Sequence, residues 1–378
     1  MKIGDPVHDD LPWLRALHDL DEARAVRSPG PKLKAVRRAA ERLGDDLRAG
    51  PKVVSVRTLP VSELIYPMDF AFQTASILPW PFVTMVHRCL LVQVEAEGAL
   101  KNVLFNPTDR ESSRATPYFR QLLDKVGWAE RVIGKSFGTV EDGLAELGLS
   151  PDDIDVIAFD HFHTQDLRPT LGTTRGDGLS GPLPARFPNA KLLAPRAEWE
   201  QWDDLHPMQR AWFITDGKRD VDRDRVVLTD GDLRIGDGCV LLATPGHTAG
   251  NQTLFVHADD GVFGCSENGT SADNWSPYES AIPGLRAFAR TYDVEVVLNS
   301  NTPQLAAEQY TSMVLERSVV DRVPGAPAFV QMFPSSEVTP SVVAPGLSPA
   351  MVFGERTSGA VRRQPRAAHG EAQRASAT

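Results

Sequence analysis

The 378-residue chain has few cysteines and no long apolar run. Its three cysteines, Cys89, Cys239 and Cys265, are too few and too scattered for a disulfide framework or a thiolate zinc site, so we expect a cytoplasmic protein. No apolar stretch reaches the roughly 18–20 residues that a membrane span needs, and the first residues show no basic-then-apolar signal segment. A disulfide-rich secreted scaffold and a membrane protein are therefore not expected.

Basic residues are not massed in any one part of the chain. The net charge is −10, and lysine and arginine are spread among aspartate and glutamate. A nucleic-acid protein usually carries a basic patch, so that class is not expected either. The 42% of hydrophobic and 24% of charged residues are typical of a globular protein. We expect an enzyme with a small-molecule substrate and no nucleic-acid or membrane partner, and the sequence leaves its oligomeric state open.

The two ends of the chain differ from its middle. Residues 1–52 hold two charged, amphipathic stretches that predict a helical extension. Residues 53–320 alternate strand-like and helix-like segments, which predicts a layered α/β domain. Residues 321–378 predict an irregular C-terminal segment, disordered past about residue 356, where Ala, Arg, Ser, Gly and Pro dominate.

Apolar patterning predicts individual elements in the middle segment. Val83–Val94 is rich in Val and Leu and predicts a strand, in which His87 is expected to be a hydrogen-bonded core histidine. Arg196–Phe213 predicts a helical stretch that Pro207 breaks or kinks. Val294–Leu298 predicts the last strand of the domain.

The first motif with catalytic potential is His161-Phe162-His163, directly after a short apolar strand at Asp155–Phe159. If the extended backbone continues, both imidazoles point to the same side and can share one metal ion. Taken alone, such a pair is more typical of surface or hydrogen-bonded histidines than of ligands. Asp160 is expected to orient a ligand imidazole or to cap the turn.

The second motif is the turn Pro245-Gly246-His247-Thr248, which follows another apolar strand. Proline and glycine favour a chain reversal, so His247 is expected at the end of the strand and outside the hydrophobic core. A lone histidine in a turn most often faces solvent. Two such motifs, each at the carboxyl end of an apolar strand, make a candidate site that is stronger than either motif alone.

These two blocks, DIDVIAFDHFHTQD and LLATPGHTAGNQTLFV, resemble the metallo-β-lactamase fold superfamily, and the resemblance covers roughly residues 53–310. Asn189–Trp202 and Leu228–Gly238 are similar to its lactonase-like branch. The resemblance implies a four-layer αββα sandwich and a metal-dependent hydrolase. It also implies that a first metal site consists of His161, His163 and His247, with Zn as the expected ion and Fe or Mn as alternatives.

The other half of the resembled site departs from the family pattern. Gln165 and Asp166 replace the family's Asp-His, and Asn301 replaces its last histidine. Glu267 aligns with the bridging aspartate and is expected to bind the metal in its place, with Gln165, Asp166 and Asn301 as a degenerate second site. Oxygen donors alone hold zinc poorly, so we expect a single ion. Asn106 stands where the family usually has the aspartate of an Asp-Thr-Gly turn.

Three functions remain open at this point. The leading hypothesis is hydrolysis of a small ester, lactone or thioester by a single metal-bound hydroxide, with Asp166 or Glu267 as the catalytic proton carrier. Asp166 could equally cap a loop and pair with Arg168. The alternatives are a mononuclear non-haem iron oxygenase acting on a thiol or persulfide, and a non-catalytic descendant of the fold that binds a ligand. The missing second-site histidines favour that last alternative.

Overall fold

The computed structural model describes residues 1–108, 110–126, 135–176 and 181–363. Its strands are β1 Ile3–Pro6, β2 Arg15–Leu17, β3 Ser55–Pro67, β4 Phe82–Ala96, β5 Ala99–Phe105, β6 Val156–Ala158, β7 Lys191–Pro195, β8 Val226–Thr229, β9 Asp232–Gly236, β10 Cys239–Ala243, β11 Gln252–Ala258, β12 Gly261–Ser266, β13 Arg322–Val323, β14 Ala326–Val330, β15 Met332–Pro334, β16 Ser336–Thr339 and β17 Thr357–Gly359.

Its α-helices are α1 Asp21–Arg24, α2 Pro29–Ala49, α3 Met68–Ala71, α4 Arg110–Ser113, α5 Pro117–Val126, α7 Val140–Glu146, α8 Leu167–Leu171, α9 Arg196–Gln201, α10 Ala272–Trp275, α11 Leu285–Tyr292 and α12 Ala306–Val319. Short 3₁₀ turns lie at Pro151–Asp153, Arg223–Arg225, Pro277–Glu279 and Pro303–Leu305. Among the described residues, no helix combines the length and the apolar character needed to cross a membrane.

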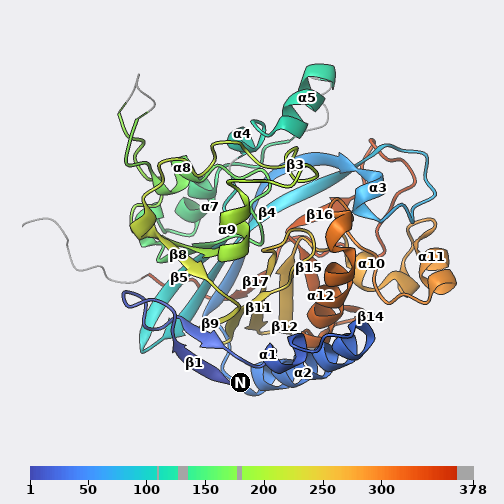
Figure 1. The fold of residues 1–378 in the computed structure, drawn as a ribbon, viewed down its shortest axis with the longest axis horizontal. Coiled ribbons are helices and arrows are strands. Elements are labelled where there is room, and N and C mark those ends of the chain that lie inside the picture. The colour runs from blue at the N-terminus through green and yellow to red at the C-terminus, as the bar shows by residue number, and fades with distance from the viewer. Residues whose placement is uncertain (109, 127–134, 177–180, 364–378) are drawn as a thin grey trace, which may run out of the picture.

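Two large sheets carry the fold (Figure 1). One has seven strands in the order β1-β2-β9-β10-β11-β12-β15. The other has eight, in the order β17-β3-β4-β5-β6-β7-β8, with β16 paired to β4. β13 and β14 form a separate two-stranded hairpin.

Side-chain alternation along the strands explains why the sheets stack. In β10, Cys239 and Leu241 belong to the core cluster that the two sheets share, whereas Val240 and Leu242 belong to the cluster under the helices. Successive side chains of a strand point to opposite faces, and here both faces are apolar. Each buried leucine of this kind contributes about 1.5–3 kcal/mol. The strand is therefore covered on both sides.

Helices cover the outer face of each sheet. α2 and α12 pack on each other and on β12 of the seven-stranded sheet, and α3, α7 and α9 pack on strands of the eight-stranded sheet. Three apolar clusters fill the spaces between these layers. The four-layer αββα sandwich that the resemblance implies is confirmed.

The C-terminal part of the chain crosses from one sheet to the other. β15 pairs with β12, β16 pairs with β4, and Ser335 lies between them. Phe333 is fully buried between the sheets, and Met332 packs under the helices. The irregular segment that composition predicts after residue 320 thus carries strands up to β17, which pairs with β3. Residues 364–378, part of the stretch predicted to be disordered, lie outside the described residues.

Three local predictions differ from the structure. The N-terminal extension is not only helical, because β2 pairs with β9 and brings β1 into the seven-stranded sheet. The helix predicted over Arg196–Phe213 ends at Gln201 and gives way to turns around Pro207. Val294–Leu298 is apolar but is not a strand: the backbone of Val297 bonds to Asn274, whose carbonyl and side chain replace a neighbouring strand.

Candidate metal centre

Three histidine rings from two distant motifs meet beyond the ends of β6 and β10. His161 and His163 follow β6, and their ring centroids lie 4.7 Å apart. The ring of His247, from the turn between β10 and β11, lies 4.5 Å from His161 and 4.9 Å from His163. One nitrogen of each ring lies within 4.8 Å of the other two. The structure brings together the three histidines that the resemblance assigns to the first metal site.

Asp160 fixes the orientation of His161. One carboxylate oxygen accepts hydrogen bonds from the backbone N–H of His161 at 2.8 Å and from its Nδ1 at 2.7 Å. The other accepts from Asn106 Nδ2 at 3.0 Å and from the Ser335 hydroxyl. Because Nδ1 carries the hydrogen, Nε2 of His161 keeps its lone pair and is the nitrogen available to an ion.

Gln209 performs the same task for His163. Its Oε1 lies 2.7 Å from Nε2 of His163, and its Nε2 donates to Thr302 Oγ1 at 3.0 Å. The Thr302 hydroxyl donates to the backbone carbonyl of His247, so it accepts from Gln209, which fixes which end of the amide faces the ring. Nε2 of His163 is therefore the protonated nitrogen, and Nδ1 carries the lone pair.

The turn that presents His247 is held by its backbone. Gly246 lies so close to α12 that a Cβ there would come within 2.5 Å of the Cα of Gln309. The backbone N–H of His247 donates to Asn268 Oδ1 at 2.9 Å, and its carbonyl accepts from Thr302. A glycine is therefore required in this turn, and the position of His247 does not depend on its own ring.

The ring nitrogens of His163 and His247 fit a shared cation. His163 Nδ1 lies 3.2 Å from His247 Nε2, close to the roughly 3.3 Å between two nitrogens of a tetrahedral zinc site. Without a cation, the two rings share one hydrogen on His247 Nε2. The Nδ1 of His247, which is buried with no hydrogen-bond partner among the described residues, then keeps an unsatisfied lone pair. A cation removes this conflict, so the three histidines fit a metal ion.

Burial also keeps two of these rings neutral. It lowers the pKa of His163 well below its usual range, and a charge on His161 lowers it further. The pKa of His247 is lowered well below its usual range by burial and by the other two rings. Neutral imidazole is the form that binds metals.

Glu267 lies at the end of β12, outside the group of three rings. Its Oε2 accepts a hydrogen bond from the backbone N–H of Ser336 at 2.9 Å. Burial raises the pKa of Glu267 well above its usual range, and the nearby charge of Asp160 raises it further. A protonated carboxyl group in this position can donate a proton.

Two of the remaining predicted residues reach the same cavity. Gln165 Nε2 donates to Thr108 Oγ1 at 3.0 Å and to the backbone carbonyl of His163 at 3.2 Å. The side-chain amide of Asn301 lies 3.1 Å from Thr302 Oγ1, and its other end is buried with no partner within the described ranges. Both amides line the cavity of the histidines.

Asp166 lies elsewhere. It is the N-cap of α8, accepting from the backbone N–H of Arg168 at 3.1 Å, and it pairs with the Arg168 guanidinium at 2.6 Å. It is not among the residues that line the cavity. The sequence analysis left two roles open for Asp166, proton carrier and cap. In the structure Asp166 makes the contacts of a cap.

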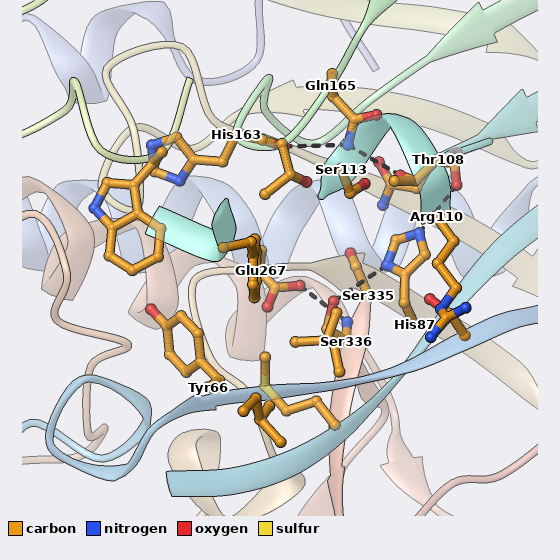
Figure 2. A pocket seen from close by; sticks show the side chains of 18 of the residues that line it. Tyr66, His87, Thr108, Arg110, Ser113, His163, Gln165, Glu267, Ser335 and Ser336 are labelled. Carbon is orange, nitrogen blue, oxygen red and sulfur yellow. Dashed lines mark hydrogen bonds between the residues drawn. The ribbon is translucent and has the colours of Figure 1, made fainter. Parts of the chain in front are cut away.

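The histidines line one wall of a cavity of about 150 Å³, part of which Figure 2 shows. Glu267, Gln165 and Asn301 add polar groups to it. The apolar part of the wall comes from β3, β4, α5 and the turns after α9: Ile65, Met85, Phe119, Leu122, Leu123 and Trp212. Polar groups thus converge at one end of a largely apolar pocket, which is typical of small-molecule sites.

Several residues of the site escaped the sequence analysis. Gln209 lies in the stretch predicted to be helical, and Ser335 and Ser336 lie in the segment predicted to be irregular. His87, predicted as a core histidine, is buried but also lines the cavity. Ser335 and Ser336 follow the apolar run Met332-Phe333-Pro334. Polar residues directly after an apolar run are the same pattern by which the histidine motifs were found, so this pair could have been found too.

No protein-family model matches the chain. Among solved structures, it is similar to a quorum-quenching N-acyl homoserine lactone lactonase, at 19% identity over 65% of this chain and 88% of that one, with a TM-score of 0.42. A probable metal-dependent hydrolase from Staphylococcus aureus matches at 12% identity, over 68% and 83% of the two chains, with a TM-score of 0.47. AidC, a dizinc quorum-quenching lactonase, matches at 12% identity over 83% and 97%, with a TM-score of 0.44.

Proposed function

We propose that this chain is a metal-dependent hydrolase that holds one ion, zinc, on His161, His163 and His247 and cleaves a small ester, lactone or thioester. The main support is the convergence of the three rings, with His163 Nδ1 at 3.2 Å from His247 Nε2, together with His247 Nδ1, which is buried with no hydrogen-bond partner among the described residues. The resemblance of both motif blocks to metallo-β-lactamase fold enzymes supports the same proposal.

The residues around the rings would hold the ion in place. When bound, the ion would supply a Lewis acid for a carbonyl oxygen and would lower the pKa of a coordinated water. Asp160 and Gln209 hold His161 and His163 with their lone pairs available to the ion, so little ring motion is needed on binding.

We assign the proton carrier to Glu267 and not to Asp166. Glu267 lines the cavity and is held by the Ser336 N–H, whereas Asp166 is paired with Arg168 away from the cavity. A carboxyl group whose pKa is raised by burial holds its proton to a higher pH, which suits a group that protonates a leaving alkoxide or thiolate.

The size and lining of the cavity support a small substrate. About 150 Å³ accommodates a compact acyl or lactone group, and Trp212, Phe119 and Met85 offer it apolar surface. Gln165 and Asn301 offer neutral hydrogen-bonding groups in place of a second ion.

Metal content and hydrolysis measured together test this proposal. The protein should hold one equivalent of zinc, stay at one in excess zinc, and hydrolyse γ-butyrolactone or an S-acetyl thioester. A chelator should remove this activity and zinc should restore it. His161→Ala should lose both zinc and activity, whereas His18→Ala, which changes a side chain that is 52% exposed, should keep both.

Other outcomes would replace the proposal. One equivalent of iron with oxygen consumption on a thiol would favour the oxygenase. A folded protein that binds no metal would favour the ligand-binding descendant. Tight binding of two zinc ions by the wild type would contradict the single-ion site.

A further inference from the structure

A second pair of reactive side chains lies in the same cavity, apart from the three histidines. His87 on β4 and Ser336 on β16 are directly opposite each other in the antiparallel register. Nδ1 of His87 lies 3.1 Å from Ser336 Oγ, and both residues line the cavity although both are more than nine-tenths buried (Figure 2).

The surroundings of His87 determine which of its ring nitrogens carries the hydrogen and which has the lone pair. Nε2 of His87 lies 3.3 Å from the backbone carbonyl of Asn106, which can only accept a hydrogen bond. Nε2 therefore carries the hydrogen, and Nδ1 has the lone pair. Burial lowers the pKa of His87 to about 4, so the ring is neutral near pH 7. The Ser336 hydroxyl can thus donate to His87 Nδ1, and it also hydrogen-bonds the carboxyl group of Glu267.

We propose that Ser336 is a nucleophile, that His87 is its general base and that the Asn106 carbonyl orients the base, so that the chain holds an acyl-transfer site that needs no metal. A nucleophile within hydrogen-bond reach of a base, with the base oriented by a third group, is the arrangement that activates serine in enzymes. This inference is independent of the proposed ion.

The neighbours of Ser336 suit this role. Its backbone N–H is held by Glu267 at 2.9 Å, which fixes the residue at the start of β16. The amide of Asn301 lines the same cavity, and one end of it has no hydrogen-bond partner in the described part of the chain.

The reaction balances with an ester and water alone. Ser336 Oγ bonds to the carbonyl carbon while its proton moves to His87 Nδ1. The carbon–oxygen bond to the alcohol breaks, and His87 returns the proton to the departing alkoxide, which leaves an acyl-serine. Water then gives a proton to His87 and attacks the acyl carbon, and Ser336 Oγ takes the proton back as the acid leaves.

Covalent labelling of the full chain tests the dyad. The protein, as purified and after chelation, is treated with diisopropyl fluorophosphate or p-nitrophenyl acetate and analysed by intact mass and peptide mapping. We expect one diisopropylphosphoryl or acetyl group on Ser336, with or without metal. The phosphorus–fluorine bond breaks, fluoride leaves and His87 takes the proton of the serine, so the adduct records the same activation.

Variants separate this role from a sheet hydrogen bond. Ser336→Ala should lose the adduct, and His87→Gln should slow labelling by about 100-fold or more, as expected for loss of a general base. Ser341→Ala is the matched control, because Ser341 also hydrogen-bonds a β4 side chain, Thr84, but does not line the cavity. It should label at the wild-type rate.

Two results would overturn the dyad. One is a wild-type protein with no adduct on Ser336, and the other is a folded His87→Gln variant that labels as fast as the wild type. If circular dichroism shows that His87→Gln is unfolded, His87→Asn takes its place. Labelling of chelated protein reports on the dyad alone, and metal content reports on the histidine site alone, so either proposal can fail without the other.

Discussion

The site has an imidazole half, His161, His163 and His247, and an oxygen half, the predicted second site of Gln165, Asp166 and Asn301. The two halves use their polar groups in opposite ways. In the imidazole half, Asp160 and Gln209 occupy the outer nitrogens of His161 and His163, so that the inner ones face the other rings of the group. In the oxygen half, Asp166 caps a helix and Gln165 bonds to the protein itself. The first half thus turns ring nitrogens toward one another, whereas Asp166 and Gln165 of the second half are engaged in the protein's own hydrogen bonds. The residue type of a side chain is therefore a weaker guide to metal binding than the hydrogen bonds that its polar atoms already make.

The strongest test of this difference removes one ring. His247→Ala should lower the zinc content from one equivalent to near zero, because two imidazoles cannot replace three. The fold should persist, since Gly246 and the backbone bonds of His247 shape the turn. Metal analysis and circular dichroism check both statements. An unfolded variant would instead assign the ring a structural role.

A second test tries to turn the oxygen half into an ion site. Gln165→Asp together with Asn301→His should raise the zinc capacity from one equivalent to two, because both positions line the cavity beside Glu267. The single variants should stay near one equivalent. Zinc titration by calorimetry measures the capacity. If the double variant also stops at one, the geometry of this half, and not its chemistry, excludes the ion.

Asp160→Asn should weaken zinc binding by about 10–100-fold, as loss of a carboxylate behind a ligand imidazole typically does. An amide cannot accept as strongly from His161 Nδ1, and its NH₂ group faces the donors Asn106 and Ser335. Competition with a chromophoric chelator measures the affinity. Asp152→Asn, on a carboxylate away from the site, should bind zinc as the wild type does. An unchanged affinity in Asp160→Asn would mean that the imidazole half does not depend on this support.

The smallest expected effect is on stability alone. Asp166→Ala should reduce the free energy of unfolding by about 1 kcal/mol, the usual value of an N-cap. Its zinc content and its turnover number should match the wild type. Urea denaturation and steady-state kinetics measure the two quantities. A large loss of turnover with unchanged stability would return Asp166 to the role of proton carrier.

Short sequence patterns predicted the two histidine motifs and the two buried sheets, because these features depend on residues that are close together in the chain. The two histidine motifs follow apolar strands, and a strand that ends at a turn presents its next side chains at the sheet edge, so both motifs could be found from the sequence. Two buried sheets also follow from strands that are apolar on both faces. The strand order, however, depends on pairs such as β12 with β15 and β4 with β16, which no short pattern contains.

The supporting residues were missed for the same reason. Gln209 reaches His163 across 46 positions of the chain, and Ser335 reaches Asp160 across 175. Val294–Leu298 is as apolar as a strand, but its backbone partners are loop groups that only the folded chain brings near. Residues that hold a ligand residue from behind carry no motif of their own, and only their packing identifies them.

The crossing of the chain from β15 to β16 has a consequence for biosynthesis. The segment that delivers Ser335 and Ser336 to the site closes a loop of 175 residues back to Asp160 and is made late on the ribosome. Contacts of such long range form slowly, because the chain loses the entropy of closing the loop before the contacts stabilise it. A nascent chain that ends before Met332 therefore has all three histidines while one wall of the cavity is still missing. Proteolysis of stalled nascent chains of increasing length should show protection of the residue-160 region rising only once residue 339 has emerged.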